Sequence, residues 1–241
     1  MAERPIFIPV SEREGYVRRV DFEIQWAGGF AETQKRKNIL SLHEAAKAAG
    51  YAPLLEVSSK SDELAGRHLS AFHLSVIGSV GKMPLECAFQ GSKVFERGGP
   101  YVDLYRSEPR DAKRDTRLRD SGDLIGFNFD GAEFPLEPKT VFYDWLYLNA
   151  IFRHRDWLKN RLDGKVRYFG FTDIEFNPNR SINCQARSCA LFVSLTREQK
   201  LENYLISAEA FIYAMRVNFV ENNQRESRLK QSRIRLRSDV R

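Results

Sequence analysis

Four side chains that could take part in chemistry are spaced as they would be on one face of a helix, at positions i, i+3, i+4 and i+7. They are Glu86, Phe89, Gln90 and Lys93. Pro84 favours the first turn of such a helix, because its missing N–H would be unpaired there in any case. A carboxylate can move protons, and an amine kept from water can attack an electrophilic carbon. The pattern therefore predicts a helix over residues 84–95 whose polar stripe holds groups that could carry a site.

The other faces of this helix decide whether the polar stripe is a site. They combine apolar with very small residues, a mixture typical of a helix that is packed on most sides: Leu85, Ala88, Val94 and Phe95 beside Cys87, Gly91 and Ser92. If those faces are buried, the polar stripe faces a cavity. The alternative is that the stripe faces bulk water, as the polar face of an amphipathic helix ordinarily does, and that its charges are surface charges.

The order Glu-x-x-Phe-Gln-x-x-Lys resembles the signature helix of the NADAR family. Four other segments resemble family elements in the same order: Leu-Ser-Ala-Phe at 69–72, Pro-Arg-Asp-Ala-Lys-Arg at 109–114, Glu-Phe-Asn-Pro at 175–178 and Asn-x-x-Ala-Arg at 183–187. Several ordered matches across about residues 69–193 are more specific than any one alone. The chain departs from the family pattern at Ala71, Cys87 and Ala186, where Asn, His and Gly are usual.

The resemblance implies an α+β fold, mainly helical, with a small sheet and an N-terminal strand-helix extension on a single domain. NADAR proteins are associated with cleavage of N-glycosidic bonds in ADP-ribose-like or riboflavin-precursor substrates. The resemblance therefore implies a pocket for a ribose joined to a heterocycle, with no metal or cofactor. The residues assigned to substrate binding are Ser70, Phe72, Phe89, Gln90, Lys113, Arg114, Tyr143, Trp145, Asn177, Asn183 and Arg187.

The chemistry fits these residue types. Breaking a C–N glycosidic bond builds positive charge on the ribose and negative charge on the leaving base, so an anion near the sugar and a proton donor near the base both help. Glu86 can supply both. Lys93 offers a second route, in which a neutral amine attacks the anomeric carbon and forms an imine with the opened sugar that water then releases. The amides and Arg187 would hold ribose hydroxyls or phosphates.

Two groups of these residues keep an alternative interpretation. Lys113 and Arg114 lie in a segment rich in both charge signs, which is typical of a solvated helix, although a fork of donors there would also suit a diphosphate. Tyr143 and Trp145 belong to an aromatic stripe at helical spacing, which indicates either core packing or a wall against a base or ribose.

One branch of the family resembles this chain more closely. The segments Ser-Leu-His-Glu-Ala-Ala at 41–46 and Phe-Gln-Gly-Ser-Lys-Val-Phe at 89–95 are similar to antitoxins paired with guanosine-specific DarT-type toxins. The resemblance implies removal of ADP-ribose from guanine bases in DNA, or alternatively in RNA, with ADP-ribose as product and a cognate toxin encoded nearby. Such a base must leave its stack to be reached, which favours single-stranded or flipped substrates. The alternatives are an N-glycosidase for riboflavin intermediates and a non-catalytic, toxin-binding antitoxin.

Composition sets the frame for this site. The chain has 241 residues, 42% of them apolar, which suits one large domain or one domain with extensions. We expect an N-terminal extension over 1–60, a catalytic domain over 61–222 and a flexible basic tail over 223–241. The absence of an 18-residue apolar run or a hydrophobic N-terminal segment predicts a cytoplasmic protein that does not enter membranes. Three cysteines without Cys-x-x-Cys spacing argue against a disulfide framework or a zinc site and indicate buried thiols.

The net charge of +6 is concentrated at the C-terminus. Residues 224–241 hold seven Lys or Arg against Glu226 and Asp239, a net +5. Such a tail is either a solvated end or an arm for phosphate backbones.

The elements that must position the site follow from periodicity and turn signals. We expect an irregular start over 1–15, strands over 17–26, 54–57, 69–76 and 169–176, a hairpin over 124–134, and helices over 33–49, 140–152, 157–164, 183–195 and from 208, with Thr33 and Ser207 as caps. His43 is expected on solvated helix surface, and His73 as an ordinary strand residue.

Overall fold

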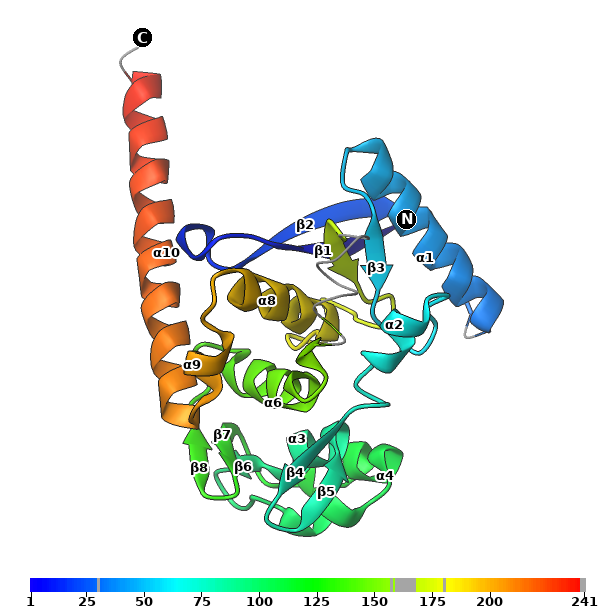
Figure 1. Cartoon of the computed structure of the whole chain (residues 1–241), viewed down its shortest axis with the longest axis vertical. Helices are drawn as coiled ribbons and strands as arrows, with labels where there is room; N and C mark the ends of the chain where they lie inside the picture. Colours follow the sequence, from blue (N-terminus) through cyan, green and yellow to red (C-terminus); the bar gives the residue numbers. More distant parts are fainter. Residues whose placement is uncertain (30, 157, 159–167, 180, 239–241) are drawn as a thin grey trace.

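The computed structural model describes residues 1–29, 31–156, 158, 168–179 and 181–238, with the side chains of all of these except 223 and 225–238. Its elements form the α+β fold that the sequence predicts, with a small mixed sheet above a layer of helices and a long C-terminal helix along one side (Figure 1). The helix predicted from Trp157 to Gly164 lies outside the described residues, apart from Leu158.

The main sheet joins the start of the chain to a strand near residue 171. Its strand order is β2-β1-β9-β3, where β1 (Ala2–Pro9) pairs antiparallel with β2 (Val17–Ile24) and with β9 (Gly170–Thr172), and β9 runs parallel to β3 (Leu54–Glu56). The prediction of an irregular start was wrong. Despite its two prolines, β1 is an inner strand, because its apolar run over residues 6–8 is at most 4% exposed and must be covered on both faces.

Helix α1 (Glu32–Ala48) covers one face of this sheet. Its buried Leu42 and Ala46 pack in one cluster with side chains from β1, β2 and β3: Ile6, Ile8, Ile24 and Leu54. The helix predicted over 33–49 is thus confirmed, although Ala31 rather than Thr33 occupies the cap position. The expected strand over 54–57 is also confirmed.

Two central helices carry most of the core beneath the sheet. Helix α8 (Gln185–Arg197) lies against β1 and β9, and α6 (Val141–Phe152) packs on α8 (Figure 1). Both helices begin within two residues of the predicted positions. Their buried aromatic and aliphatic side chains belong to one large hydrophobic cluster that includes Tyr143, Tyr147, Leu191 and Phe192.

The lower part of the molecule is built from short elements. The predicted hairpin is confirmed as β7 (Leu124–Phe129) and β8 (Ala132–Phe134), closed by Asp130 and Gly131 at φ 51° and 88° and joined by a third strand, β6 (Lys93–Phe95). The remaining elements are α2 (Leu64–His68), the hairpin β4 (Ser75–Gly78) and β5 (Gly81–Pro84), α3 (Leu85–Gly91), the 3-10 turn η2 (Val102–Arg106), α4 (Pro109–Arg114) and α5 (Arg117–Asp120).

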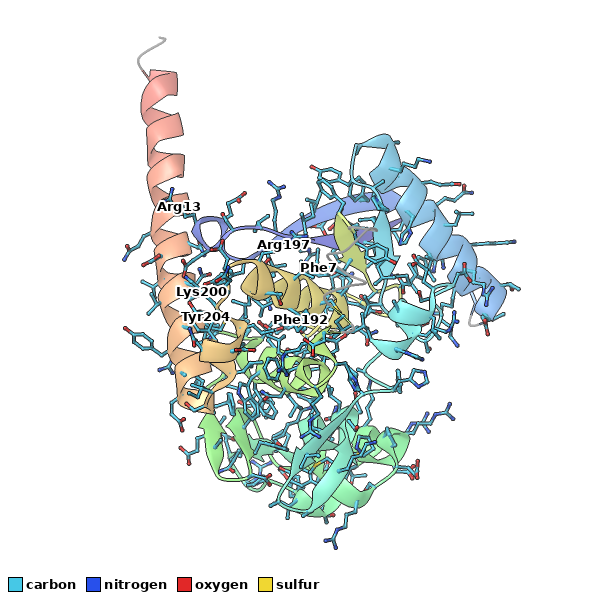
Figure 2. All side chains as sticks on the ribbon, in the orientation of Figure 1. Phe7, Arg13, Phe192, Arg197, Lys200 and Tyr204 are labelled. Carbon is cyan, nitrogen blue, oxygen red and sulfur yellow. The ribbon has the colours of Figure 1, made fainter. Side chains whose placement is uncertain are left out.

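The C-terminal helices contact a short 3-10 turn near the start of the chain. Ser207 accepts a hydrogen bond from the Ala210 N–H at 3.1 Å, as predicted for the cap of α10 (Ala208–Ser238). Before it, α9 (Leu201–Leu205) and its neighbour Lys200 face the 3-10 turn η1 (Glu12–Glu14), where Lys200 forms an ion pair with Glu12 (Figure 2). The basic segment is helical to residue 238, and its flexibility stays a prediction. Over the residues described here, no helix combines the length and the apolar character needed to cross a bilayer.

Candidate functional site

The polar stripe of the sequence is divided between a helix and a strand. Helix α3 ends at Gly91, Ser92 is its C-terminal cap, and Lys93 is the first residue of β6, paired with Phe127. The prediction of one helix from Pro84 to Phe95 was therefore wrong at both ends. Pro84 is the last residue of β5 and occupies the N-cap position of α3, before its first helical residue.

The helix ends there because its last turn is pressed against a tyrosine. A Cβ atom on Gly91 would lie 2.7 Å from the ring of Tyr105, so only glycine fits at this position. The Ser92 hydroxyl then donates to the Ala88 carbonyl at 2.7 Å and lies 3.0 Å from the Tyr105 hydroxyl. The Ser92 carbonyl already accepts from the Asn128 N–H of β7, which turns the chain into the sheet.

Lys93 nevertheless remains beside the other residues of the stripe. Its Nζ lies 5.1 Å from the centre of the Phe89 ring, and burial lowers the pKa of its amine, while Glu86 acts to raise that pKa and Lys113 to lower it. On the helix, Gln90 Nε2 donates to Glu86 Oε1 at 2.9 Å, the i, i+4 contact expected from the spacing. The corner between α3 and β6, here called the α3–β6 corner (Glu86, Phe89, Gln90, Lys93), therefore holds a carboxylate near a partly dehydrated amine.

The aromatic residues predicted as a wall go to two places. Tyr143 packs edge-on against Phe89, with ring centroids 5.4 Å apart, and so borders the α3–β6 corner. Trp145, two residues further along α6, packs instead on Phe129 and Phe134 of the hairpin. Tyr143 is thus placed as a wall would be, and Trp145 is a core residue of the hairpin contact.

A second group of charged residues lies at the ends of strands β3 and β9 and was not predicted. Glu56 on β3 and Asp173 just after β9 are 3% and 8% exposed. Glu56 accepts hydrogen bonds from the Thr172 hydroxyl at 2.6 Å and the Ile174 N–H at 2.9 Å. Burial raises the pKa of both carboxyls, and in Asp173 the neighbouring Glu56 raises it further. We call these two residues the β3–β9 carboxyl pair.

Helix α1 contributes side chains next to this pair. His43 Nε2 lies 2.9 Å from the Thr172 hydroxyl that donates to Glu56, and burial lowers the pKa of His43 to about 4. Lys35 Nζ lies 3.4 Å from a carboxylate oxygen of Glu175. The expectation that His43 is solvated surface was therefore wrong, because its face of α1 lies over β9 rather than in water.

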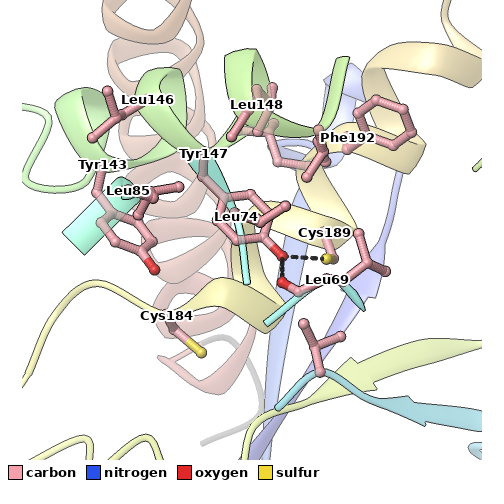
Figure 3. Packing of buried hydrophobic residues seen from close by; sticks show 14 of the residues in the cluster. Leu69, Leu74, Leu85, Tyr143, Leu146, Tyr147, Leu148, Cys184, Cys189 and Phe192 are labelled. Carbon is pink, nitrogen blue, oxygen red and sulfur yellow. Dashed lines mark hydrogen bonds between the residues drawn. The ribbon is translucent and has the colours of Figure 1, made fainter. Parts of the chain in front are cut away.

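Tyr143 connects the two groups. Burial raises the pKa of its hydroxyl, and the next causes are the nearby Asp173, Cys184 and Glu86. Figure 3 shows the Tyr143 hydroxyl and the Cys184 thiol within the same packed region, with Tyr147 donating to the Leu69 carbonyl beside them. The α3–β6 corner and the β3–β9 carboxyl pair therefore flank the same tyrosine.

The segment around Ser70 is a turn and not the predicted strand. The His73 N–H bonds to the Ser70 carbonyl, and the Ala71 N–H donates to Gln185 Oε1 at 2.7 Å. Because Gln185 also hydrogen-bonds Asp173, the turn lies at the carboxyl pair. Ser70 is fully buried and Phe72 is 58% exposed. His73, expected as a strand residue, is exposed on this turn.

The start of α8 presents two more of the predicted residues. Arg187 forms an ion pair with Asp144 of α6, which also accepts a hydrogen bond from the Ser188 hydroxyl at 2.7 Å. Asn183 is half-buried beside Cys184. Part of the Arg187 guanidinium is thus already engaged within the protein.

The last three predicted residues lie nearer the surface. Asn177 is half-buried, and its side-chain oxygen accepts from the Asn179 N–H at 3.0 Å in the predicted turn. Lys113 and Arg114, at the end of α4, are exposed. Lys113 is close enough to Lys93 to lower the pKa of its amine. Arg114 is connected to the site only as the residue next to Lys113 in the chain.

Several buried polar atoms in this region have no hydrogen-bond partner among the described residues. They include Ser70 Oγ, Gln90 Oε1, Asn183 Oδ1 and Trp145 Nε1, all four from residues assigned to substrate binding. A buried polar atom without a partner is unfavourable by about 1–3 kcal/mol, so such atoms are uncommon unless a ligand completes them. Three of the four come from segments that meet at Tyr143, which marks that place as the candidate binding site.

Sequence reasoning missed Glu56, Asp173 and Gln185. The available signal was an acid inside an apolar run, in Leu-Leu-Glu-Val at 54–57 and Phe-Thr-Asp-Ile at 171–174. Acids are rarely buried unless they are paired or functional, so each was an anomaly in a strand that otherwise looked like ordinary core.

Comparison with known proteins gives one result. A family model described as "DarT1-associated NADAR antitoxin" matches residues 2–225, which covers nearly the whole chain. No curated protein matches the chain.

Proposed function

Because the chain belongs to the family of DarT1-associated NADAR antitoxins, we propose that it removes ADP-ribose from guanine bases of nucleic acid by cleaving the N-glycosidic bond. The observation that carries this proposal is the placement of Lys93. Its amine lies over the Phe89 ring, with a pKa lowered by burial, beside the Glu86 carboxylate. A lysine in such a place has more of the neutral form that attacks carbon than a lysine in water.

The reaction proceeds in two steps. The neutral Lys93 amine forms a bond to the anomeric carbon of the ribose as the bond to the guanine nitrogen breaks, and the protonated Glu86 gives its proton to the leaving base. As the sugar ring opens, one proton of the new ammonium passes to the ring oxygen, which leaves a protonated imine between Lys93 and the ribose carbon. Glu86, now a carboxylate, takes a proton from water as the resulting hydroxide adds to this carbon, and the hydroxyl of the carbinolamine then gives its proton to the nitrogen as the C–N bond breaks. The neutral Lys93 amine and the protonated Glu86 are restored, and the sum is hydrolysis to ADP-ribose and unmodified guanine in the strand.

The surrounding residues bind the two ends of the substrate. Gln90 is oriented by its bond to Glu86, which leaves its side-chain oxygen free for a ribose hydroxyl. Ser70 Oγ and Asn183 Oδ1 likewise have no hydrogen-bond partner among the described residues and could bind the substrate. Lys113, close to Lys93, would meet the diphosphate at the exposed edge of the site together with Arg114. Each of these bonds pairs an atom that has no partner within the described part of the chain or places a cation against an anion.

Borohydride trapping tests the nucleophile directly. We expect sodium borohydride, added while the protein hydrolyses an ADP-ribosylated guanosine oligonucleotide, to reduce the imine and leave an ADP-ribosyl adduct on Lys93 that peptide mass spectrometry locates. The matched control is Lys47→Ala, an exposed substitution on α1 that keeps Lys93 and should still give the adduct. A wild-type protein that turns over under these conditions without any adduct would exclude the covalent route.

The alternatives appear as other outcomes of the same assay. An N-glycosidase for riboflavin intermediates would hydrolyse aminopyrimidine ribosyl phosphates and leave the oligonucleotide intact. A non-catalytic antitoxin would hydrolyse neither substrate, and toxin neutralisation would survive Lys93→Ala.

A further inference from the structure

A second pocket lies beside the candidate site, where α2, the 69–73 turn and the C-terminal end of α6 meet. It has a volume of about 430 Å³. Its floor is apolar and buried, with Leu69, Leu74, Ile151 and Leu158 at most 7% exposed. Its rim holds three of the four histidines of the chain, all on the surface: His68, His73 and His154.

The 69–73 turn is the wall between this pocket and the candidate site. One part of the turn belongs to the site, since the Ala71 N–H is bound to Gln185 and Ser70 Oγ is buried without a partner in the described protein. Another part, Leu69 and His73, lines the second pocket. Tyr147 of α6 fixes the wall by donating to the Leu69 carbonyl (Figure 3). A substrate held at Ser70 is therefore one turn of chain away from the histidines.

The lining indicates a planar, partly polar ligand. An apolar floor accepts the face of a ring, and imidazoles can stack on a base or hydrogen-bond its edge and its phosphate. The volume lies within the range of about 300–1,000 Å³ typical of small-molecule pockets. A metal ion does not fit this trio, because no group of three His, Cys, Asp or Glu side chains in the described part of the chain could hold one.

We propose that this pocket binds the nucleobase next to the modified guanine in a single-stranded substrate. The inference rests on the proposed function and extends it, because a guanine drawn into the site brings along the bases to which the strand joins it. The adenine of ADP-ribose is the competing occupant. It is disfavoured because the diphosphate would be met by Lys113 on α4, an element that does not line this pocket.

Two substrates separate these occupants. ADP-ribosylated guanosine as a free nucleoside contains the adenine but has no neighbouring base, whereas an ADP-ribosylated single-stranded oligonucleotide has both. In the double variant His73→Ala/His154→Ala we expect KM for the oligonucleotide to rise about five- to hundredfold, the usual effect of losing one stacked base. The kinetics of the nucleoside should stay within twofold of wild type. The control is Lys47→Ala, an exposed substitution on α1.

A third substrate gives the double-mutant test. In this substrate an abasic nucleotide replaces one neighbour of the modified guanosine. The replacement should raise the KM of the wild type by about the same five- to hundredfold. In the double variant it should not raise KM any further. An unchanged KM for the oligonucleotide in the double variant would overturn the proposal. Equal losses on nucleoside and oligonucleotide would assign the pocket to adenine instead.

Failure of the proposed function would look different. If the wild type hydrolyses neither substrate, the pocket is tested by fluorescence anisotropy with an unmodified single-stranded oligonucleotide. The proposal then requires binding that the double variant weakens at least fivefold and Lys47→Ala does not. Equal binding of the oligonucleotide by the wild type, the double variant and Lys47→Ala would overturn the proposal.

Discussion

Two glutamates in this protein show how differently the same side chain can be used. Glu86 in the α3–β6 corner is half-buried, bonded to an amide and close to a lysine. Glu56 in the β3–β9 carboxyl pair is almost fully buried, accepts two hydrogen bonds, and has another carboxyl as its charged neighbour. Water and a cation keep the first available for proton transfer. The second is favoured in its protonated form, since burial raises its pKa.

Acids in this fold thus serve two different purposes, one in chemistry and the other in holding the structure together. In the α3–β6 corner Gln90 Oε1 has no hydrogen-bond partner among the described residues and suits a ligand. In the carboxyl pair the oxygens of Glu56 already bind Thr172 and Ile174 and so hold the segment after β9 in place. We therefore expect substitutions in the first region to change activity and those in the second to change stability.

The strongest test is removal of the amine. Lys93→Ala should lower the single-turnover rate of hydrolysis by about 10³-fold or more, because the covalent step loses its nucleophile. The folded state should be kept, since a half-buried lysine pays desolvation that alanine does not. A rate within tenfold of wild type would remove Lys93 from the reaction.

The next test exchanges the catalytic acid for its amide. Glu86→Gln keeps the shape and the contact with Gln90 but cannot give a proton, so we expect kcat to fall by about 10²- to 10⁴-fold. The melting temperature should change little. Asp173→Asn is the matched exchange in the carboxyl pair, and it should lower kcat by less than tenfold. Comparable losses of kcat in the two variants would contradict the proposed division between a catalytic and a structural region.

A glycine tests the architecture of the corner. Gly91→Ala places a Cβ 2.7 Å from the ring of Tyr105, which should lower the free energy of unfolding by about 1–3 kcal/mol, as overpacking usually does. It should also move Lys93, whose strand begins two residues later. Gly28→Ala, with no atom within 4 Å of the added carbon, is the control in denaturant unfolding and should change stability by less than about 0.5 kcal/mol.

The smallest expected effect concerns the pH dependence of stability. The pKa of Glu56 is raised in the folded state, so between its unfolded and folded pKa values the folded protein binds more protons than the unfolded chain. Stability from this group is present at acid pH and is lost as pH rises through the folded pKa. Glu56→Gln should abolish this loss, giving a higher melting temperature than wild type at pH 8 and a smaller difference at pH 5. An unchanged pH profile would mean that Glu56 is ionised in the fold.

The sequence predicted the parts of the fold that local pattern decides. Helices α6 and α8 and the β7–β8 hairpin have apolar periodicity and turn residues within a single segment, and the contact between Gln90 and Glu86 follows from helical spacing alone. Other parts depend on distant partners. β1 lies inside the sheet because β9 pairs with the edge that β2 leaves open, and Lys93 leaves the helix because Tyr105 blocks the last turn and β7 offers a strand. The buried carboxyls were missed for the same reason, since their bonds come from the neighbouring strand.

The position of β1 inside the sheet also bears on how this antitoxin is made. Phe7 pairs with Phe171, so the earliest strand of the chain cannot complete its pairing until more than two-thirds of the polypeptide has left the ribosome. During synthesis the face of β1 that carries Phe7 stays open to chaperones and to neighbouring nascent chains, because its packing partners come from later in the chain. Strand β9, which leads directly into the loop that carries Asp173 and Asn177, completes the sheet between β1 and β3, and the site can therefore assemble only late in translation.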